Sequence, residues 1–265
     1  MSGAQSPAVL RAVSILEVLS GSAGRALTLS DIARQIGAPK STTATICASL
    51  LETGLIQYGA GGYSLGRRLV EFGGAYLTTV EPLADLYDLC RSLPYASRET
   101  VRIAVLDGLN VLYLFIATGQ RPLRLSAEVG DRTLAPHTAT GKAMLAKLPE
   151  DELERLLVRQ PRFPATTAAS IRTAEELRQA LVEVRRRGYA VDDEEAHEGI
   201  FCVSVAAETQ APAPNRLMAV SATLLKPQMS EALTKELLSD LAAIANYLAR
   251  PLGASRIEAL TARRD

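Results

Sequence analysis

The sequence predicts an α+β protein: a small helical part with one β-hairpin over residues 1–78, a linker helix over residues 79–93, and a larger part with an antiparallel sheet over residues 94–265. Three observations lead to this division. Two short amphipathic helices joined by a glycine-containing turn come early, a Gly-rich hairpin follows them, and the remainder combines paired apolar strands with helices.

The composition is that of a folded protein, and the net charge of its N-terminal part differs modestly from that of the remainder. The chain has 265 residues, of which 48% are hydrophobic, so it can bury a sizeable core. The 29 basic and 29 acidic residues balance, which argues against a chain-wide nucleic-acid polyelectrolyte. Residues 1–80 hold six Lys or Arg and four Asp or Glu, a balance of +2 whose sign favours contact with phosphates.

The cysteines and the apolar runs bear on location. Cys47, Cys90 and Cys202 are far apart and form no CxxC pair, which favours a reducing compartment over a disulfide framework. The first residues lack a signal-peptide pattern, and no apolar run is long enough to span a membrane. We therefore expect a cytoplasmic protein that does not enter the membrane.

The first helix is expected over residues 8–20. Its apolar residues recur at helical spacing and predict one inward face, with Ile15 beside the stripe formed by Val9, Val13, Leu16 and Leu19.

A helix-turn-helix is expected next. Thr28 or Ser30 can cap a short helix that ends at Gly37. Pro39 is suited to the first position of a second helix, which is expected to run to about Thr53.

A hairpin and further helices complete the expected elements. The hairpin has its tip at Gly59–Gly62, the length of a wing, and the helix after it carries Leu69, Phe72 and Tyr76 on one side. These features predict a winged helix-turn-helix. The linker helix should begin at Pro82 and bury a stripe of Leu83, Leu86, Cys90 and Leu93.

The helix that begins near Lys40 is predicted to have two different faces. At about 100° per residue, one arc collects Thr43, Ile46, Cys47, Leu50 and Leu51, which predicts contact with the core. The opposite arc is small and polar, so the helix axis can approach base edges in a major groove. With neighbouring positions on the turn and wing, we predict DNA contacts from Ser30, Lys40, Ser41, Thr42, Ala44, Thr45, Ala48, Ser49 and Tyr63.

Several separated segments resemble the IclR family of bacterial transcription regulators. They include LTLSDIARQIGAPKSTT, GGYSLGRRLVEFG, TATGKAMLAKL, RRRGYAVDDEE, GIFCVSVAA and LARPLG, which together cover nearly the whole chain. The resemblance implies a C-terminal GAF-like domain that binds a small effector, and homodimers that can pair into tetramers. The family commonly has an Arg on the recognition helix where this chain has Thr45–Ile46, so an Arg-to-guanine contact is not carried over.

The resemblance also implies which residues line the effector pocket. In the family, the pocket is lined by the start of one helix, by the acid before a strand, and by residues on the strands that follow. In this sequence these are, in the same order, Thr140 and Gly141, then Asp192, then Cys202, Ser221 and Thr223. Leu123, Leu125 and Met144 could supply apolar walls. The expected ligand is a small organic acid, an aromatic metabolite or a related neutral compound, since helix N–H groups favour a carboxylate whereas Asp192 disfavours one unless protonated or hydrogen-bonded.

The sequence gives weaker support for a metal site, for a phosphate-binding loop and for a hydrolase. Asp193 and His197 lie four residues apart in an acidic stretch, but no second His or Cys has supporting spacing for a metal. TATGKAM lacks the full spacing of a phosphate-binding loop, and no nucleophile–base pair supports a hydrolase. We predict a DNA-binding regulator with no cofactor, metal or catalytic residue; a hydrolase-like enzyme and an effector-independent DNA-binding protein remain the alternatives.

Overall fold

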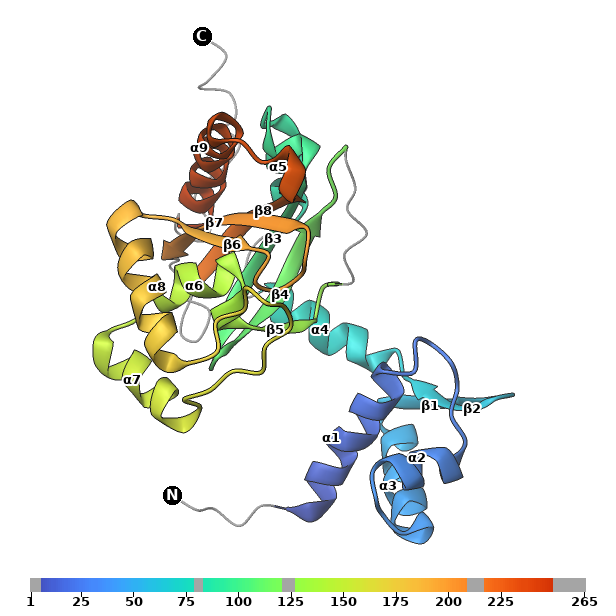
Figure 1. Cartoon of the computed structure of the whole chain (residues 1–265). Helices are drawn as coiled ribbons and strands as arrows, with labels where there is room; N and C mark the ends of the chain where they lie inside the picture. The colour runs from blue at the N-terminus through green and yellow to red at the C-terminus, as the bar shows by residue number, and fades with distance from the viewer. Residues whose placement is uncertain (1–5, 79–82, 121–126, 209–216, 250–265) are drawn as a thin grey trace. The chain divides into compact units, whose positions relative to one another are not determined.

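The computed structural model describes residues 6–78, 83–120, 127–208 and 217–249, and the chain forms two compact units, Met1–Thr79 and Val80–Asp265 (Figure 1). Each unit has its own elements and its own core. No helix within the described ranges is both long and apolar enough to cross a membrane.

The first unit is a winged helix-turn-helix, as predicted. Its core contains Ile15, Ile32, Cys47 and Ile56, all at most 2% exposed. The hairpin closes with Ile56 opposite Leu65. The elements are α1 (Pro7–Ser20), α2 (Leu29–Gln35), α3 (Lys40–Glu52), β1 (Ile56–Gly59), β2 (Gly62–Leu65) and α4 (Arg68–Thr78).

The predicted inward face of α1 is wrong at two positions. Val9 is 61% exposed and Val13 is 48% exposed, whereas Ile15 and Leu19 are buried. The helix packs against α3 and β2, with Ile15 and Leu19 buried and Ala12, Leu16 and Val18 partly buried beside them. The helical spacing of the apolar residues predicts how wide the apolar face is, but it does not predict which part of that face contacts the core.

One other local feature differs from expectation, at the start of α3, while the predicted cap of α2 is confirmed. Pro39 is the N-cap of α3, with extended backbone angles, and Lys40 is the first helical residue. The cap of α2 is Thr28, whose side chain accepts a hydrogen bond from the backbone N–H of Asp31. The apolar side of α4 is open to solvent at Phe72 and Tyr76.

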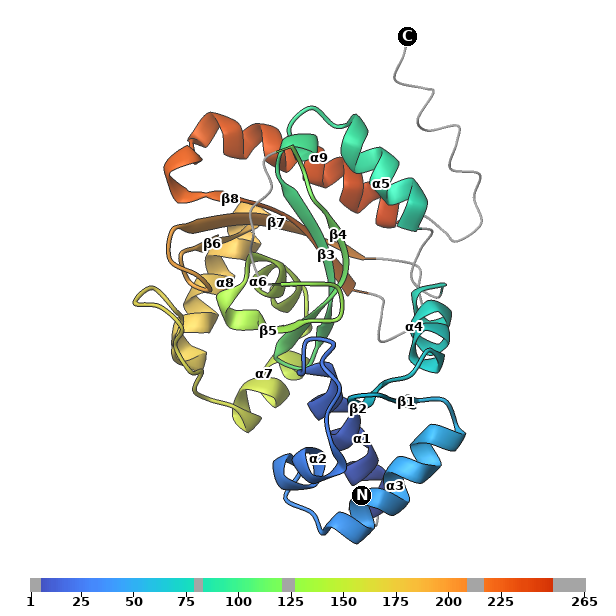
Figure 2. The same ribbon diagram turned by 90° about the vertical axis from the view of Figure 1, so that its right-hand side faces the viewer.

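The second unit is a three-layer arrangement around one antiparallel sheet of order β5-β4-β3-β8-β7-β6. Helices α5 and α9 cover one face, and α6, backed by α8, covers the other (Figures 1 and 2). The strands are β3 (Thr100–Asp107), β4 (Asn110–Ala117), β5 (Arg132–Leu134), β6 (Ala190–Asp193), β7 (Ile200–Glu208) and β8 (Leu217–Leu225). The helices are α5 (Leu83–Ser92), α6 (Ala139–Leu145), α7 (Glu150–Arg159), α8 (Ala174–Arg187) and α9 (Glu231–Leu248).

Helix α5 packs within the second unit. Leu86, Cys90 and Leu93 are buried, as the predicted stripe requires. Asp240 of α9 accepts hydrogen bonds from the backbone N–H groups of Tyr95 and Ala96, both at 2.8 Å, which ties the segment after α5 to α9. Pro82 and the side chain of Leu83 lie outside the described residues, and the assignment of residues 79–93 as a linker stays a prediction.

Local sequence signals set both ends of α8, and α8 packs against α6. Thr173 and Glu176 form the predicted capping box, and Gly188 ends α8 in the left-handed conformation. After α8, Ala190–Asp193 forms strand β6, paired with β7, so the first two acids of the acidic stretch lie on the sheet. This pairing brings Asp192 onto the sheet opposite Cys202.

Candidate functional site

Helix α3 presents the two faces that its sequence predicts. Thr43, Cys47 and Leu50 are buried, while the opposite side is open to solvent. We call this side the outer face of α3; it comprises the exposed residues Lys40, Ser41, Thr45, Ala48 and Ser49 and the half-buried Thr42 and Ala44.

The hydroxyls of the outer face are oriented by the helix itself. Thr45 Oγ1 donates to the carbonyl of Ser41 at 3.2 Å, and Ser49 Oγ donates to the carbonyl of Thr45 at 3.3 Å. Each hydroxyl proton is engaged, so the oxygens are left to accept hydrogen bonds from donors such as the amino groups of adenine or cytosine.

The other two predicted DNA-contacting residues differ in exposure. Ser30, at the start of α2, is exposed. Tyr63 is half-buried against the core of the first unit and stacks edge-on with Tyr58, with ring centroids 5.0 Å apart. Tyr58, paired with Tyr63 on the other strand of the wing, is 67% exposed; strand alternation places it on the same face as buried Ile56, so the sequence pattern gave no signal for its exposure.

A narrow cavity lies in the second unit, between the start of α6 and the sheet. Its open volume is about 40 Å³, room for a few water molecules. The lining residues include five of the predicted set, Thr140, Asp192, Cys202, Ser221 and Thr223, and also Arg102, Tyr113, Ala127, Thr133, Thr138, Ala139, Ala196, His197 and Ile200.

Sheet register explains why distant parts of the sequence meet here. Asp192 lies opposite Cys202, and Cys202 lies opposite Thr223. Residues of a strand that share a face with these are two positions away, which places Ser221 beside Thr223. The thiol of Cys202 contacts Thr223 Oγ1 at 3.4 Å. Thr138 caps α6 above them by accepting a hydrogen bond from the backbone N–H of Gly141 at 3.0 Å.

Two predicted pocket residues that the structure describes, Gly141 and Met144, are not among the residues that line the cavity. A Cβ on Gly141 would lie 2.2 Å from the carbonyl oxygen of Ala135, so this glycine permits a close backbone contact instead. Met144 belongs to the apolar core cluster that includes Leu153 and Leu177. Leu123 and Leu125 lie outside the described residues.

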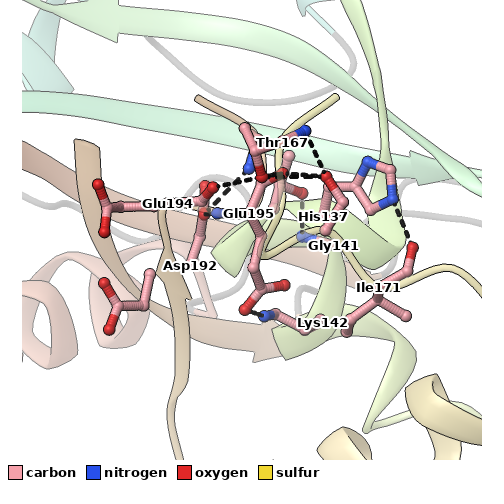
Figure 3. A network of polar contacts seen from close by, with 12 residues as sticks. His137, Gly141, Lys142, Thr167, Ile171, Asp192, Glu194 and Glu195 are labelled. Atoms are coloured by element: carbon pink, nitrogen blue, oxygen red, sulfur yellow. Dashed lines mark hydrogen bonds and ion pairs between the residues drawn. The ribbon is translucent and has the colours of Figure 1, made fainter. Parts of the chain in front are cut away.

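The acidic end of the cavity is held by a dense polar network (Figure 3). Asp192 Oδ1 accepts hydrogen bonds from the backbone N–H groups of Glu195 at 2.8 Å and Ala196 at 3.2 Å. Glu195 also forms a buried ion pair with Lys142 of α6. Loss of hydration raises the pKa of Asp192 to about 6 and that of Glu195 to about 7, while the charge of Lys142 opposes both shifts.

The segment before α8 closes this network from the other side. The hydroxyls of Thr167 and Ser170 donate to the carbonyls of Glu194 and Glu195, both at 2.7 Å. His137, buried next to the cap of α6, contacts the carbonyl of Ile171 through Nε2 at 2.7 Å, and burial lowers its pKa (Figure 3). The turn that follows Asp192 is therefore held from two sides, by Lys142 of α6 and by the segment with Thr167 and Ser170.

The described residues give little support to metal or nucleophile chemistry. No group of three His, Cys, Asp or Glu converges in the described ranges. Asp193, which was considered from the sequence together with His197 as a metal ligand, forms an ion pair with Lys226. Loss of hydration, with Asp192 nearby, raises the pKa of Cys202 to about 12, so its thiol stays protonated and weakly nucleophilic near neutral pH.

Comparisons with known proteins agree with this geometry. Residues 8–60 match the family model of the IclR helix-turn-helix domain, and residues 76–250 match that of the bacterial transcriptional regulator IclR C-terminal domain. The transcriptional repressor IclR of Escherichia coli K12 is 31% identical over 204 residues, which cover 76% of this chain and 74% of that protein.

Solved structures share the fold. An IclR transcriptional regulator from Alicyclobacillus acidocaldarius superposes with a TM-score of 0.77 at 25% identity, covering 92% of this chain and 98% of the other. An IclR homologue from Microbacterium hydrocarbonoxydans in complex with 4-hydroxybenzoate gives a TM-score of 0.74 at 23% identity, covering 91% and 98%. The chain thus belongs to the IclR family of bacterial transcription regulators, with a helix-turn-helix domain that binds DNA and a C-terminal domain that binds a small effector.

Proposed function

We propose that α3 is the recognition helix and that its outer face reads operator DNA through small contacts. The observation that carries this proposal is the combination of a buried inner face with an exposed outer face of short side chains. Short side chains let the helix axis approach the bases, and the methyl groups of Ala44, Thr45 and Ala48 can meet thymine methyls. Lys40, exposed at the helix start, is placed to contact a phosphate.

The protein acts as a homodimer, or a tetramer of paired dimers, on a palindromic operator. A two-fold symmetric dimer requires two half-sites related by the same symmetry. This assembly rests on the family resemblance. Because the partner is chromosomal DNA, we place the protein in the cytoplasm.

The cavity between α6 and the sheet is the effector site. It gathers Thr140, Asp192, Cys202, Ser221 and Thr223, which offer hydroxyl, thiol and carboxyl groups to a polar ligand. The ligand is a small organic acid, an aromatic metabolite or a related neutral compound, and the 4-hydroxybenzoate in one structural neighbour supports that range. Binding changes operator affinity through a coupling free energy of about 1–3 kcal/mol.

This site binds its ligand without turning it over. The high pKa of the Cys202 thiol removes the most obvious nucleophile, and His137 is engaged by the carbonyl of Ile171. Turnover of an ester or amide that is lost in Cys202→Ala or His197→Ala would favour the hydrolase alternative.

The test is direct binding to DNA. Fluorescence anisotropy of the full chain on the DNA upstream of its own gene, at low salt, should show specific binding. Unrelated DNA should be a poor competitor for this binding. Absence of specific binding, with and without metabolite candidates, would overturn the proposal. Specific binding that no metabolite alters would favour the effector-independent alternative.

A further inference from the structure

Arg102 is a buried cation with unusually little bonding. It lies in the middle of β3, is 5% exposed, and lines the cavity. Its Nη1 donates to Thr223 Oγ1 at 2.7 Å, and its Nε is buried without a hydrogen-bond partner. The guanidinium also stands 5.9 Å from the centre of the Tyr113 ring.

Among the residues that the structure describes, no carboxylate forms an ion pair with Arg102. Within the described residues, every ion pair involves other side chains, and the hydrogen-bond partner of Arg102 is a neutral hydroxyl. A buried guanidinium is costly unless an anion accepts from it, and its planar fork matches a carboxylate with two parallel hydrogen bonds. Arg102 therefore has one nitrogen bonded, another free, and a cavity beside it.

The cavity has opposite charges at its two ends. Arg102 comes from β3 and Asp192 from β6, and strands β8 and β7 lie between them. The two backbones are three strand spacings of about 4.8 Å apart, roughly 14 Å in total. The distance between the two charged groups is shorter, because each side chain extends from its strand toward the other. Ser221, Thr223 and Cys202 supply neutral polar groups along the floor.

From this polarity, we infer that the effector is a small monocarboxylate whose carboxylate is bound by Arg102 and whose other end carries a hydrogen-bond donor directed at Asp192. The inference rests on the proposed effector site and names the chemical class of its ligand. Arg102 then acts as the residue that selects an acid over its neutral analogue.

The acidic end disfavours a second carboxylate. Asp192 already accepts two backbone hydrogen bonds through Oδ1 and has Glu195 nearby, while Lys142 is engaged by Glu195. His197 lies on the exposed rim. A dicarboxylate would bring like charge to Asp192, whereas a hydroxyl or an amino group would donate to it.

The test uses the full chain and three matched probe sets. The probes are 3-hydroxypropanoate, 5-hydroxypentanoate and 4-(hydroxymethyl)benzoate, each compared with its primary amide and with malonate, glutarate or terephthalate, respectively. Thermal shift and calorimetry are measured on the wild type, on Arg102→Met, and on Arg155→Gln, which removes an exposed cation of α7.

At least one hydroxy acid should stabilise the wild type and bind about tenfold or more tightly than its amide and its dicarboxylate, because a charge-assisted bond is stronger than a neutral one. Arg102→Met should lose this preference while the ligand-free protein becomes more heat-stable, because a buried unpaired charge is removed. Arg155→Gln should bind like the wild type. If Arg102→Met does not fold, Arg102→Lys should fold and show the preference reduced.

The inference is overturned if no acid is preferred to its amide, or if Arg102→Met or Arg102→Lys keeps the full preference. A lower melting temperature of ligand-free Arg102→Met would also contradict it, since that is the result for a purely structural arginine. Operator binding of the same preparations separates the two proposals: wild type that still binds DNA specifically leaves the proposed function standing when the ligand class fails.

Discussion

Lys142 of α6 and Glu195, which follows β6, form an ion pair whose side chains are only 4% and 15% exposed. The pair joins the start of α6 to the turn that holds Asp192, so it fixes one end of the cavity. One oxygen of Glu195, Oε2, is buried without a hydrogen-bond partner. Desolvation of this carboxylate is therefore only partly compensated.

This pair predicts a particular pH dependence of stability. Burial raises the pKa of Glu195 to about 7 from 4.5, so the folded protein holds this proton more tightly than the unfolded chain does. The contribution to stability is complete below about pH 4.5 and is lost as the pH rises through about 7. The free energy of unfolding of the wild type should fall relative to that of Glu195→Gln over this window, by up to about 1.4 kcal/mol per pH unit.

Urea unfolding at several pH values checks this, with the exposed Glu198→Gln as the control that keeps the wild-type profile. Parallel profiles for wild type and Glu195→Gln would show that the carboxyl titrates as it does in the unfolded chain.

Gly141 should tolerate no side chain. A Cβ there would lie 2.2 Å from the carbonyl oxygen and 2.3 Å from the Cα of Ala135, both backbone atoms. Gly141→Ala should destabilise the protein by about 1–3 kcal/mol or more, as overpacking does. Gly73→Ala in α4 meets no atom within 4 Å and should stabilise that helix by about 0.5–1 kcal/mol. Chemical unfolding of both variants tests the contrast, and equal effects would refute it.

Asp240 should be needed to hold the segment after α5 on α9. Its Oδ2 accepts from two backbone N–H groups, and it is 6% exposed. Asp240→Ala leaves one buried and one part-buried N–H group without this acceptor, so we expect a loss of about 1–3 kcal/mol in unfolding free energy. Asp240→Asn retains an acceptor oxygen and should lose less. An Asp240→Ala protein as stable as the wild type would show that water replaces the carboxylate.

Thr45 should contribute to DNA affinity without contributing much to stability. It is exposed, and its hydroxyl already bonds to its own helix. Thr45→Ala should weaken operator binding by roughly 1 kcal/mol or more and reduce selectivity, with unfolding changed by less than about 0.5 kcal/mol. Thr234→Ala in α9 removes the same kind of bond, from Thr234 to Ser230, and serves as the control. Anisotropy that is unchanged in Thr45→Ala would mean that α3 faces the DNA differently.

Elements with local signals could be predicted from the sequence. Thr173, Glu176 and Gly188 mark both ends of α8, because capping and left-handed termination depend on the nearest residues. The alternation of buried and exposed residues on α3 is likewise local. Val9 and Val13 are a different case, since a helix pattern says which residues share a face but not which side a tertiary partner covers.

The cavity could be predicted only in part. In the sequence, Asp192 belongs to an acidic stretch, and its place on β6 depends on pairing with β7. Arg102 was missed because a lone Arg in a strand usually points to solvent, whereas both faces of β3 are covered by helices. The available signal was its position between Val101 and Ile103 in an otherwise apolar run, which is typical of a strand buried on both sides.

The central claim is that a ligand held in the second unit changes the DNA affinity of the first. Its most direct test is the dissociation constant of the wild type for its operator, measured by anisotropy with and without a saturating concentration of the compound that stabilises it most. The account predicts a shift of about 5- to 150-fold, equivalent to 1–3 kcal/mol, that is absent in a variant unable to bind the compound. An operator affinity that does not change at saturation would contradict the account.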